Sequence, residues 1–441
     1  MQPPFVPAHR HRLRNAFREF TWGGEWAVSL SQQIKHNLTW FFFDGLFSSA
    51  IDNIVITYVT LYILALGASR AQVGLMSSFS SLSAAILLLP GAILVERYGH
   101  RKEFTLLFGG AGARLAVLAL ALLPFLVHGT AIVWVAIGLS VTRDAFNNLA
   151  YPAWMSVTAD VVPMEGRGRF FGSRNFVMGL SGMVVVLLVG VLITRLAIPV
   201  GYQVAFGLAF ALGLISTFSF SRLRDPKSNA RPRQVTAPFS LRSMLKDIQA
   251  HPVFLALGLV MALWNFSVNI AGPFFNVYMV ANLKFTASMV GIASISSTVA
   301  SLLIQRRVGR LADRWGSRKV LLLSMLLIPI LPIIWMFAAN FWHVIAINLL
   351  SGAFWGTFNL VSFNFLLTLT PDAQRARFSA FYQILVMLAL AGGAALGAWV
   401  VTQYGYQILF GWSAVGRVAA AVLFIRFVPA NAEKEAALAT L

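Results

Sequence analysis

The side chains with the clearest chemical potential in this sequence are charged groups inside long apolar runs. Asp44 and Asp52 lie in the first run, Arg114 in the third, and Arg143 and Asp144 in the fourth. A charge at the centre of a bilayer costs roughly 2.5–3.5 kcal/mol on insertion scales, so each charge retained there is a functional candidate. Because a carboxylate can exchange an arginine partner for a proton, we predict that these residues couple proton movement to the activity of the protein.

Helical spacing indicates which of these groups share a face. Asp44 and Asp52 are eight residues apart, which is about 80° of rotation on a helix, so both can face one interior. In the fourth run Arg143, Asn147 and Tyr151 recur every four residues and share a helix face. We therefore predict that Asn147 and Tyr151 line a cavity beside the charges.

The two acids of the first run are expected to differ in role. Asp52 lies deeper in the run than Asp44, which is nearer the start and is expected to be better hydrated. We predict that Asp52 is the main coupling acid and Asp44 a relay. An ion pair of Asp52 with Arg143, or of Asp144 with Arg114, could instead only brace the helix bundle, and that alternative stays open.

The second half of the chain offers amides and aromatic rings at depth rather than acids. Asn265 and Asn269 share a helix face near Tyr278, and Trp355 and Asn359 share a face of a later run. We predict that these residues line the substrate cavity, because amides and rings suit an amphipathic ligand and rings can also hold a cation. For any single ring, packing or lipid contact is the commoner role.

Composition places these groups in a membrane protein. Of 441 residues, 58% are hydrophobic and only 11% are charged, whereas about a quarter of the residues in soluble proteins are charged. The net charge of +19 comes from basic residues that lie between the apolar runs. Basic residues that bind nucleic acid should cluster on one folded face, so no nucleic-acid partner is expected. The chain has no cysteine, and its 7 histidines fall in tails, loops or the ends of runs. We predict no metal site and no cofactor.

Twelve apolar runs are long enough to cross a bilayer, which takes about 20 residues. Basic residues, Arg174 among them, concentrate in the loops on the side of the N-terminus, and this asymmetry predicts that both termini are cytoplasmic. The first run is too long for a cleavable signal peptide and is interpreted as a retained helix. We therefore predict an all-α, multi-pass protein of a bacterial inner membrane, with spans at 38–66, 72–95, 103–127, 130–160, 172–197, 201–221, 253–282, 286–307, 320–339, 342–370, 377–402 and 405–427.

Polar stretches divide the chain into two halves. Residues 222–252 form the longest polar, basic, proline-bearing stretch within the chain, and we predict that they are a cytoplasmic linker between six-helix bundles at 38–221 and 253–428. Tails at 1–37 and 429–441 flank the bundles. The basic and aromatic residues of the first tail favour a segment on an anionic membrane surface, and a disordered tail is the alternative.

The two halves repeat several motifs in the same order. The turn at 308–319 (VGRLADRWGSRK) corresponds to 92–102 (AILVERYGHRK). Residues 163–170 correspond to 371–378, and residues 201–207 correspond to 405–411. Collinear matches at a nearly constant offset predict two pseudo-symmetric bundles.

In the form Gly-x-x-x-Asp-Arg-x-Gly-x-Arg-Lys, the charged turn resembles the signature cytoplasmic loop of the major facilitator superfamily of secondary transporters. The resemblance covers residues 38–427 and implies the fold of that family, with a substrate site between two six-helix bundles. In the family the acid of this loop latches the halves together by accepting hydrogen bonds at the start of a helix in the other half. The gating residues that the resemblance implies are Glu96, Arg97, Gly99 and Arg101 in the first half and Gly309, Asp313, Arg314, Gly316 and Arg318 in the second.

The acid pair of the first run and the arginine of the fourth also resemble those of multidrug–proton antiporters in this family. We therefore predict a monomeric secondary transporter in the lipid bilayer that exports amphipathic small molecules in exchange for protons. A proton symporter for uptake of a polar solute, such as a sugar or peptide, is one alternative, and a non-transporting sensor or scaffold is another. An enzyme would need paired catalytic acids or a histidine cluster at depth. The cluster is missing and arginines accompany the aspartates, so we predict no enzyme.

Overall fold

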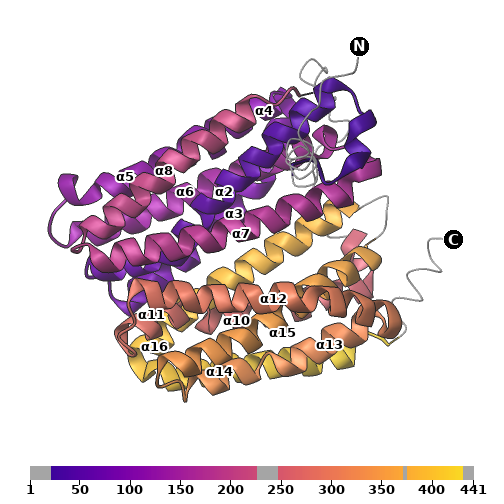
Figure 1. The fold of residues 1–441 in the computed structure, drawn as a ribbon. Helices are drawn as coiled ribbons and strands as arrows, with labels where there is room; N and C mark the ends of the chain where they lie inside the picture. The colour runs from indigo at the N-terminus through magenta and orange to yellow at the C-terminus, as the bar shows by residue number, and fades with distance from the viewer. Residues whose placement is uncertain (1–20, 226–246, 371–374, 431–441) are drawn as a thin grey trace, which may run out of the picture. The chain divides into compact units, whose positions relative to one another are not determined.

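The computed structural model describes residues 21–225, 247–370 and 375–430, and within these ranges the chain is helical, with no strand (Figure 1). Ten helices there are long and apolar enough to cross a membrane. The difference from the twelve predicted spans has two causes. Polar residues lower the mean hydropathy of α6 (Ala131–Val161), which is nevertheless 31 residues long. The last two predicted spans form one helix, α16 (Arg375–Phe427), bent at Gly405, whose φ is +79°. The all-α, twelve-span prediction is confirmed.

The helices belong to two compact units. Unit 1 comprises Met1–Val59, Pro90–Val127 and Thr142–Val235, and unit 2 comprises Thr60–Leu89, His128–Val141 and Thr236–Leu441. Three long helices contribute to both units because they cross these boundaries. They are α2 (Gln32–Ala65), α3 (Arg70–Tyr98) and α6.

Unit 1 also contains a span interrupted by a π-helical turn. Here α4 (Arg101–Thr105), η2 (Leu106–Gly112) and α5 (Ala113–Leu126) follow one another without a break, and α5 runs beside α8 in Figure 1. The remaining elements of the unit are η1 (Glu25–Ser29), η3 (Met164–Gly166), α7 (Arg167–Arg195) and α8 (Val200–Ser221).

The described part of the N-terminal tail packs against the helices of unit 1, to which it belongs. The indole nitrogen of Trp22 donates a hydrogen bond to the Thr39 hydroxyl at 2.9 Å. The ring of Trp26 lies so close to Gly166 that this position has no room for a side chain. These contacts place the tail on the turn that joins α6 to α7.

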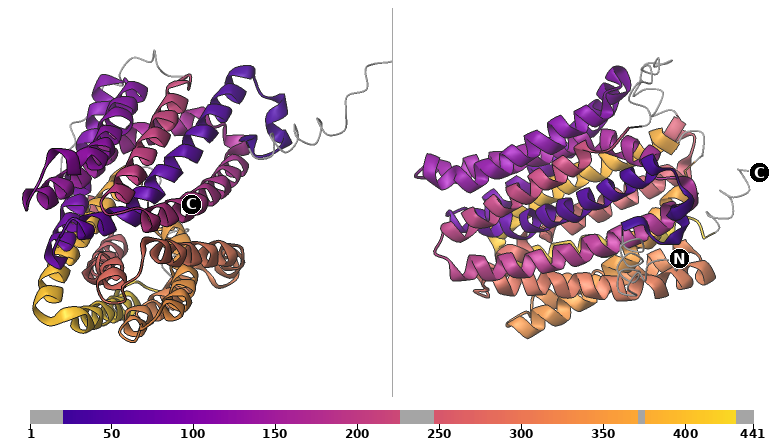
Figure 2. Two further views of the ribbon diagram at one scale, coloured as in Figure 1. Left: turned by 60° about the vertical axis from the view of Figure 1, so that its left-hand side comes forward. Right: turned by 45° about the horizontal axis from the view of Figure 1, so that its top comes forward.

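Unit 2 is built mainly from the second half of the chain. Figure 2 shows its long helices from two further directions. Two glycines bring α16 against α10, since a Cβ atom at Gly393 or Gly397 would collide with the backbone carbonyl of Phe266 or Ile270. The helices of the unit besides α16 are α10 (Pro252–Ala271), α11 (Phe274–Ala281), α12 (Ala287–Trp315), α13 (Ser317–Leu327), α14 (Ile330–Trp335) and α15 (Phe341–Thr368).

The sequence repeat has a structural counterpart, because one asparagine in each unit makes a similar contact between two helices. In unit 1, Asn53 of α2 lies against Gly182 of α7, where a Cβ atom would fall 2.5 Å from the Asn53 amide nitrogen. In unit 2, Asn269 of α10 donates a hydrogen bond to the Leu390 carbonyl of α16 at 2.7 Å. Positions 182 and 390 are 208 residues apart, as are positions 163 and 371 of the matched motif. Asn53 and Asn269 are 216 residues apart, like positions 92 and 308 of the matched turn, so corresponding asparagines join corresponding helices.

Candidate functional site

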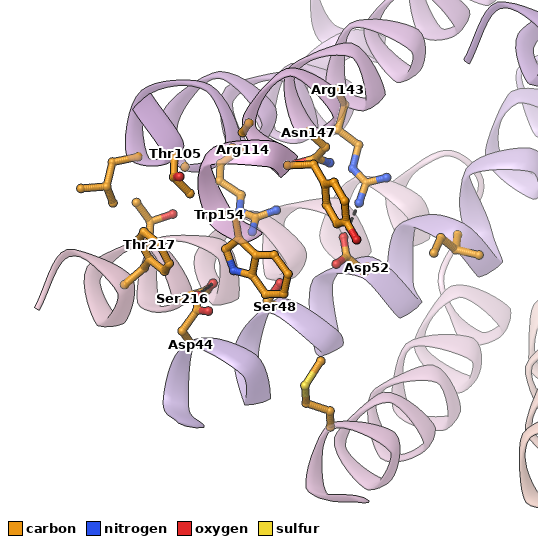
Figure 3. A pocket seen from close by; sticks show the side chains of 18 of the residues that line it. Asp44, Ser48, Asp52, Thr105, Arg114, Arg143, Asn147, Trp154, Ser216 and Thr217 are labelled. Atoms are coloured by element: carbon orange, nitrogen blue, oxygen red, sulfur yellow. Dashed lines mark hydrogen bonds and ion pairs between the residues drawn. The ribbon is translucent and has the colours of Figure 1, made fainter. Parts of the chain in front are cut away.

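A cavity of about 410 Å³ lies within unit 1, a volume typical of a small-molecule site. Its lining residues come from α2, the span 101–126, α6, α7 and α8, and their charged, polar and aromatic side chains meet there (Figure 3). The lining residues are Asp44, Ser48, Asp52, Ile56, Thr105, Leu106, Gly109, Gly110, Arg114, Arg143, Asn147, Ala150, Tyr151, Trp154, Arg174, Met178, Ser216, Thr217 and Phe220.

Helical periodicity places the polar side chains of α2 and α6 on the sides of these helices that face the cavity. Asp44, Ser48 and Asp52 follow one another at intervals of four, which keeps them on one side of α2. On α6, Asn147 and Tyr151 both line the cavity, and the Tyr151 ring stacks on Trp154 with the centroids 6.0 Å apart. The cavity therefore combines charged groups with an aromatic wall.

An ion pair joins α2 to α6 at the cavity. The Arg143 guanidinium binds Asp52 through one terminal nitrogen and Asp144, at 3.0 Å, through the other. The Arg143 side chain is buried, whereas that of Asp52 is 43% exposed. Asp52 is thus both paired and accessible from the cavity.

Asp44 occupies a drier position than Asp52. Its side chain is only 8% exposed, accepts a hydrogen bond from the Ser216 hydroxyl at 2.8 Å and lies 3.6 Å from Arg174. The expectation that Asp44 would be the better hydrated acid is therefore wrong. Distance along a helix does not decide exposure here, because α7 and α8 cover Asp44 while Asp52 opens onto the cavity.

Arg114 enters the cavity from α5 and has no carboxylate within ion-pair distance among the described residues. It is 8% exposed, and its buried Nε atom has no hydrogen-bond partner in that part of the chain. Gly213 of α8 makes room for it, since a Cβ atom there would lie 2.7 Å from the Arg114 Cδ atom. The bracing pair of Asp144 with Arg114 is not formed, because Asp144 binds Arg143 instead.

The π-helical turn η2 forms the wall of the cavity just before Arg114. Gly109 and Gly110 lie in this turn, and a Cβ atom at Gly110 would fall 2.8 Å from the Thr217 methyl carbon. The Thr217 hydroxyl is buried without a hydrogen-bond partner in the described ranges. A π-helical turn inserts an extra residue into a helix and is frequent at functional sites.

The second-half residues predicted to line a cavity all belong to unit 2, whereas the cavity above is lined by unit 1. Asn265 donates to the Met261 carbonyl one turn earlier in α10, and Asn269 donates to Leu390. The Tyr278 hydroxyl donates to the Ala338 carbonyl at 3.2 Å. Trp355 packs against Trp264 and Phe358, and Asn359 is exposed.

The predicted gating residues of the first half surround the end of α3. Glu96 and Arg97 are exposed, and Gly99 turns the chain with a φ of +71°. Arg101 is buried instead, where it binds Asp160 at the end of α6 and Asp225 beyond α8. Arg101 therefore ties three segments of unit 1 together.

The predicted gating residues of the second half surround the end of α12. Gly309 lies within the helix with open space around it, Arg314 is exposed, and Gly316 ends the helix with a φ of +83°. Arg318 donates to the Val428 carbonyl at 2.6 Å after α16. The side chain of Asp313 lies outside the described part of the structure.

Several residues that line the cavity were not predicted from the sequence. Arg174 was counted among the loop arginines, yet it is buried in the cavity wall beside Asp44. Its position inside the predicted span 172–197 is the signal that could have found it. Ser216 and Thr217 carried no such signal, because small hydroxyl residues are common in membrane helices. In the described ranges no group of three histidines, cysteines or acids is placed to hold a metal.

Comparisons with known proteins agree with this architecture. The family model of the Major Facilitator Superfamily matches residues 41–278 and 257–440. The multi-drug resistance efflux pump PmrA of Streptococcus pneumoniae is 25% identical over 390 residues, covering 85% of this chain and 92% of that protein. The multidrug resistance protein MdtG of Proteus mirabilis is 22% identical over 396 residues, covering 86% and 92%.

Solved structures share the fold at low sequence identity. A crystal structure of a mutant nucleoside transporter NupG superposes with a TM-score of 0.72 at 13% identity, covering 89% of this chain and 100% of that one. A peptide transporter POT, also a mutant, superposes with a TM-score of 0.65 at 12% identity, covering 88% and 94%. At these identities the likeness establishes the fold alone.

Proposed function

The chain belongs to the Major Facilitator Superfamily, and we propose that this transporter uses the cavity of unit 1 to export small amphipathic molecules in exchange for protons. As a member of the family it is an integral, multi-pass membrane protein that moves small molecules. Proton coupling and the direction of transport are the parts that the proposal adds.

The ion pair of Asp52 with Arg143 is the observation that carries the proposal. A proton on Asp52 removes the charge that holds Arg143, so protonation and the ion pair exclude one another. The pair joins α2 to α6, and Asp52 is accessible from the cavity. Protonation would therefore loosen one helix contact at the place where a ligand would bind, which supplies a link between proton binding and conformation.

The shape of the site and the names of two relatives support amphipathic substrates. Tyr151 and Trp154 present stacked rings beside charged groups, a surface that suits a molecule with an apolar body and a polar head. Relatives that share 22–25% of their residues with this chain over most of its length are named for multidrug resistance or efflux. Export of several such compounds is the activity we infer from both observations.

Further features complete the proposal. We propose that the protein acts as a monomer in a bacterial inner membrane, that both termini are cytoplasmic, and that no catalytic step occurs. Residues 38–221 and 253–428 would be the two halves that alternate, with 222–252 as their linker. Asp313 and Glu96 would latch them, and Asn265, Asn269, Tyr278, Trp355 and Asn359 would contact substrate during the cycle.

The sign of proton movement tests this function. Purified protein is reconstituted into vesicles that contain a pH-sensitive dye, and an outward gradient of an amphipathic compound is imposed without a pH gradient, with an anionic and a cationic compound tested in turn. Exchange predicts that protons enter the vesicles as the compound leaves. Protons that leave together with the compound would favour the symporter, and compound flux without proton movement would refute coupling. Empty vesicles give the passive leak of the compound.

A further inference from the structure

We propose that Arg114 makes the cavity of unit 1 a binding site for organic oxyanions, so that the preferred substrates are amphipathic molecules with a carboxylate or phosphonate head. This inference rests on the proposed function and deepens it by naming the substrate class. The aromatic residues of the sequence suggested that rings could hold a cation, whereas the arrangement of charges in the cavity favours an anionic ligand.

Every carboxylate that lines the cavity already has a cationic partner. Asp52 binds Arg143, and Asp44 binds Arg174 and the Ser216 hydroxyl. A cationic ligand at either acid would therefore have to share the carboxylate with an arginine. The like charge of that arginine opposes the binding of a second cation.

Arg114 is the cation of the cavity that lacks such a partner among the described residues. Its guanidinium nitrogens lie more than 4 Å from the oxygens of every described carboxylate. The residue is only 8% exposed, and Figure 3 shows its side chain pointing into the cavity. A buried charge is stable only when paired or hydrogen-bonded. An oxyanion entering the cavity would supply that partner without breaking an existing pair.

Neutral donors and an apolar wall complete the site. The Thr217 hydroxyl is buried and lacks a hydrogen-bond partner in the described ranges, and the Asn147 amide also lines the cavity. Guanidinium, hydroxyl and amide groups together match the several acceptor atoms of a carboxylate or phosphonate. Tyr151 and Trp154 would contact the apolar body, and about 410 Å³ accommodates one or two fused rings beside the head group.

The arginine is held in place by packing. A Cβ atom at Gly213 would lie 2.7 Å from the Arg114 Cδ atom, so the aliphatic part of the side chain lies directly against α8. The π-helical turn η2 ends immediately before α5, which carries Arg114. The guanidinium is therefore presented to the cavity by its own helix and by its neighbour.

Four probes that share a naphthalene body test the inference on the full-length protein in lipid nanodiscs. They are 2-naphthoate, 2-naphthylphosphonate, 2-naphthamide and 2-naphthylmethylammonium, with binding measured by calorimetry. A charge-assisted contact predicts that both oxyanions bind at least about tenfold more tightly than the amide and the ammonium. Equal or tighter binding of the amide or ammonium, or no saturable binding of either oxyanion, would overturn the proposal.

Variants then assign the preference to this residue. Arg114→Gln should remove the preference for oxyanions and leave the amide affinity unchanged, while Arg114→Lys should keep part of it. Thr217→Val preserves the shape of the side chain and should weaken the binding of the oxyanions alone. If Arg114→Gln does not fold, this variant tests the oxyanion site in its place. Arg417→Gln is the matched control, because Arg417 is also a buried arginine but belongs to unit 2, so its loss should not affect selectivity.

A preference that persists in Arg114→Gln, or in Thr217→Val at full strength, would contradict the assignment. These measurements use no ion gradient, so they separate substrate class from coupling. Oxyanion selectivity without proton movement in the vesicle assay would refute the proposed exchange and leave this inference standing. Proton exchange in a protein that binds the ammonium probe more tightly than the oxyanions would refute this inference and leave the proposed exchange standing.

Discussion

Arg174 of α7 and Asp44 of α2 form a buried ion pair in the cavity wall, with 3.6 Å between the guanidinium nitrogen and the carboxylate oxygen. The Arg174 guanidinium also lies 4.2 Å above the ring of Phe41 and donates to the Phe41 carbonyl at 3.1 Å. Gly45 makes this position possible, since a Cβ atom there would fall 2.5 Å from the guanidinium carbon. The pair therefore fastens α2 to α7.

Removing the acid of this pair should destabilise the protein. In Asp44→Asn the Arg174 charge stays buried without its carboxylate, which costs about 3 kcal/mol or more. Thermal unfolding in detergent should show a clearly lower melting temperature. Asp144→Asn is the matched control. In this variant Arg143 keeps Asp52 as its partner, so the protein should lose little stability.

A double variant separates pairing from other effects of Asp44→Asn. Adding Arg174→Met removes the stranded charge, so the double variant should unfold at a higher temperature than Asp44→Asn alone. Simple addition of the two losses would show that the side chains act independently, contrary to the pairing.

Asp225 is expected to stabilise the part of unit 1 where α6 and α8 end. Its side chain is 2% exposed and binds Arg101, which also donates a hydrogen bond to Asp160 at 2.6 Å. Asp225→Asn should lower stability by about 2–3 kcal/mol, because a buried charge-assisted hydrogen bond is weakened. Thermal unfolding compared with Asp160→Asn, whose carboxylate is more exposed, should show the larger loss for Asp225→Asn. Equal losses would argue against a special role for Asp225.

Sequence reasoning found the helices and the charges inside them because both depend on local patterns. Apolar length predicts a span and spacing of four predicts a shared face, but neither pattern chooses partners on another helix. The pair of Asp52 with Arg143 was one of two alternatives, and the pair of Asp144 with Arg114 is not formed. Asp225 could not be found in this way, because its partner Arg101 is 124 residues away and the stretch around it was interpreted as linker. Arg174 was misplaced because a charge near the start of a span has the same local signature as a loop charge. The relative exposure of Asp44 and Asp52 depends on neighbouring helices, which no single run of sequence describes.

Close packing of α16 against α10 predicts a cost for even one methyl group. In Gly397→Ala the new Cβ atom would meet the Ile270 carbonyl and lie 2.8 Å from the Phe274 ring. Overpacking of this kind costs about 1–3 kcal/mol, which thermal unfolding should detect. Gly207→Ala in α8 is the control, since nothing lies within 4 Å of its Cβ position and alanine favours the helix. A melting temperature that is unchanged in Gly397→Ala would contradict the close approach.

Asp52→Asn should abolish proton-driven transport while leaving ligand binding largely intact. The amide cannot exchange a proton for Arg143, so the contact between α2 and α6 no longer responds to protonation. Flux driven by a pH gradient in vesicles should fall at least about tenfold, since the coupling link is removed rather than weakened. Equilibrium binding in nanodiscs should change by less than about threefold, because Arg114 and the aromatic wall remain.

Asp144→Asn provides the matched comparison for coupling. Asp144 binds the same guanidinium, at 3.0 Å, but it is not among the residues that line the cavity. It should therefore retain most of the gradient-driven flux. Full flux in Asp52→Asn would assign Asp52 a bracing role only, and equal loss in both variants would place the coupling in Arg143 and its whole carboxylate set rather than in Asp52.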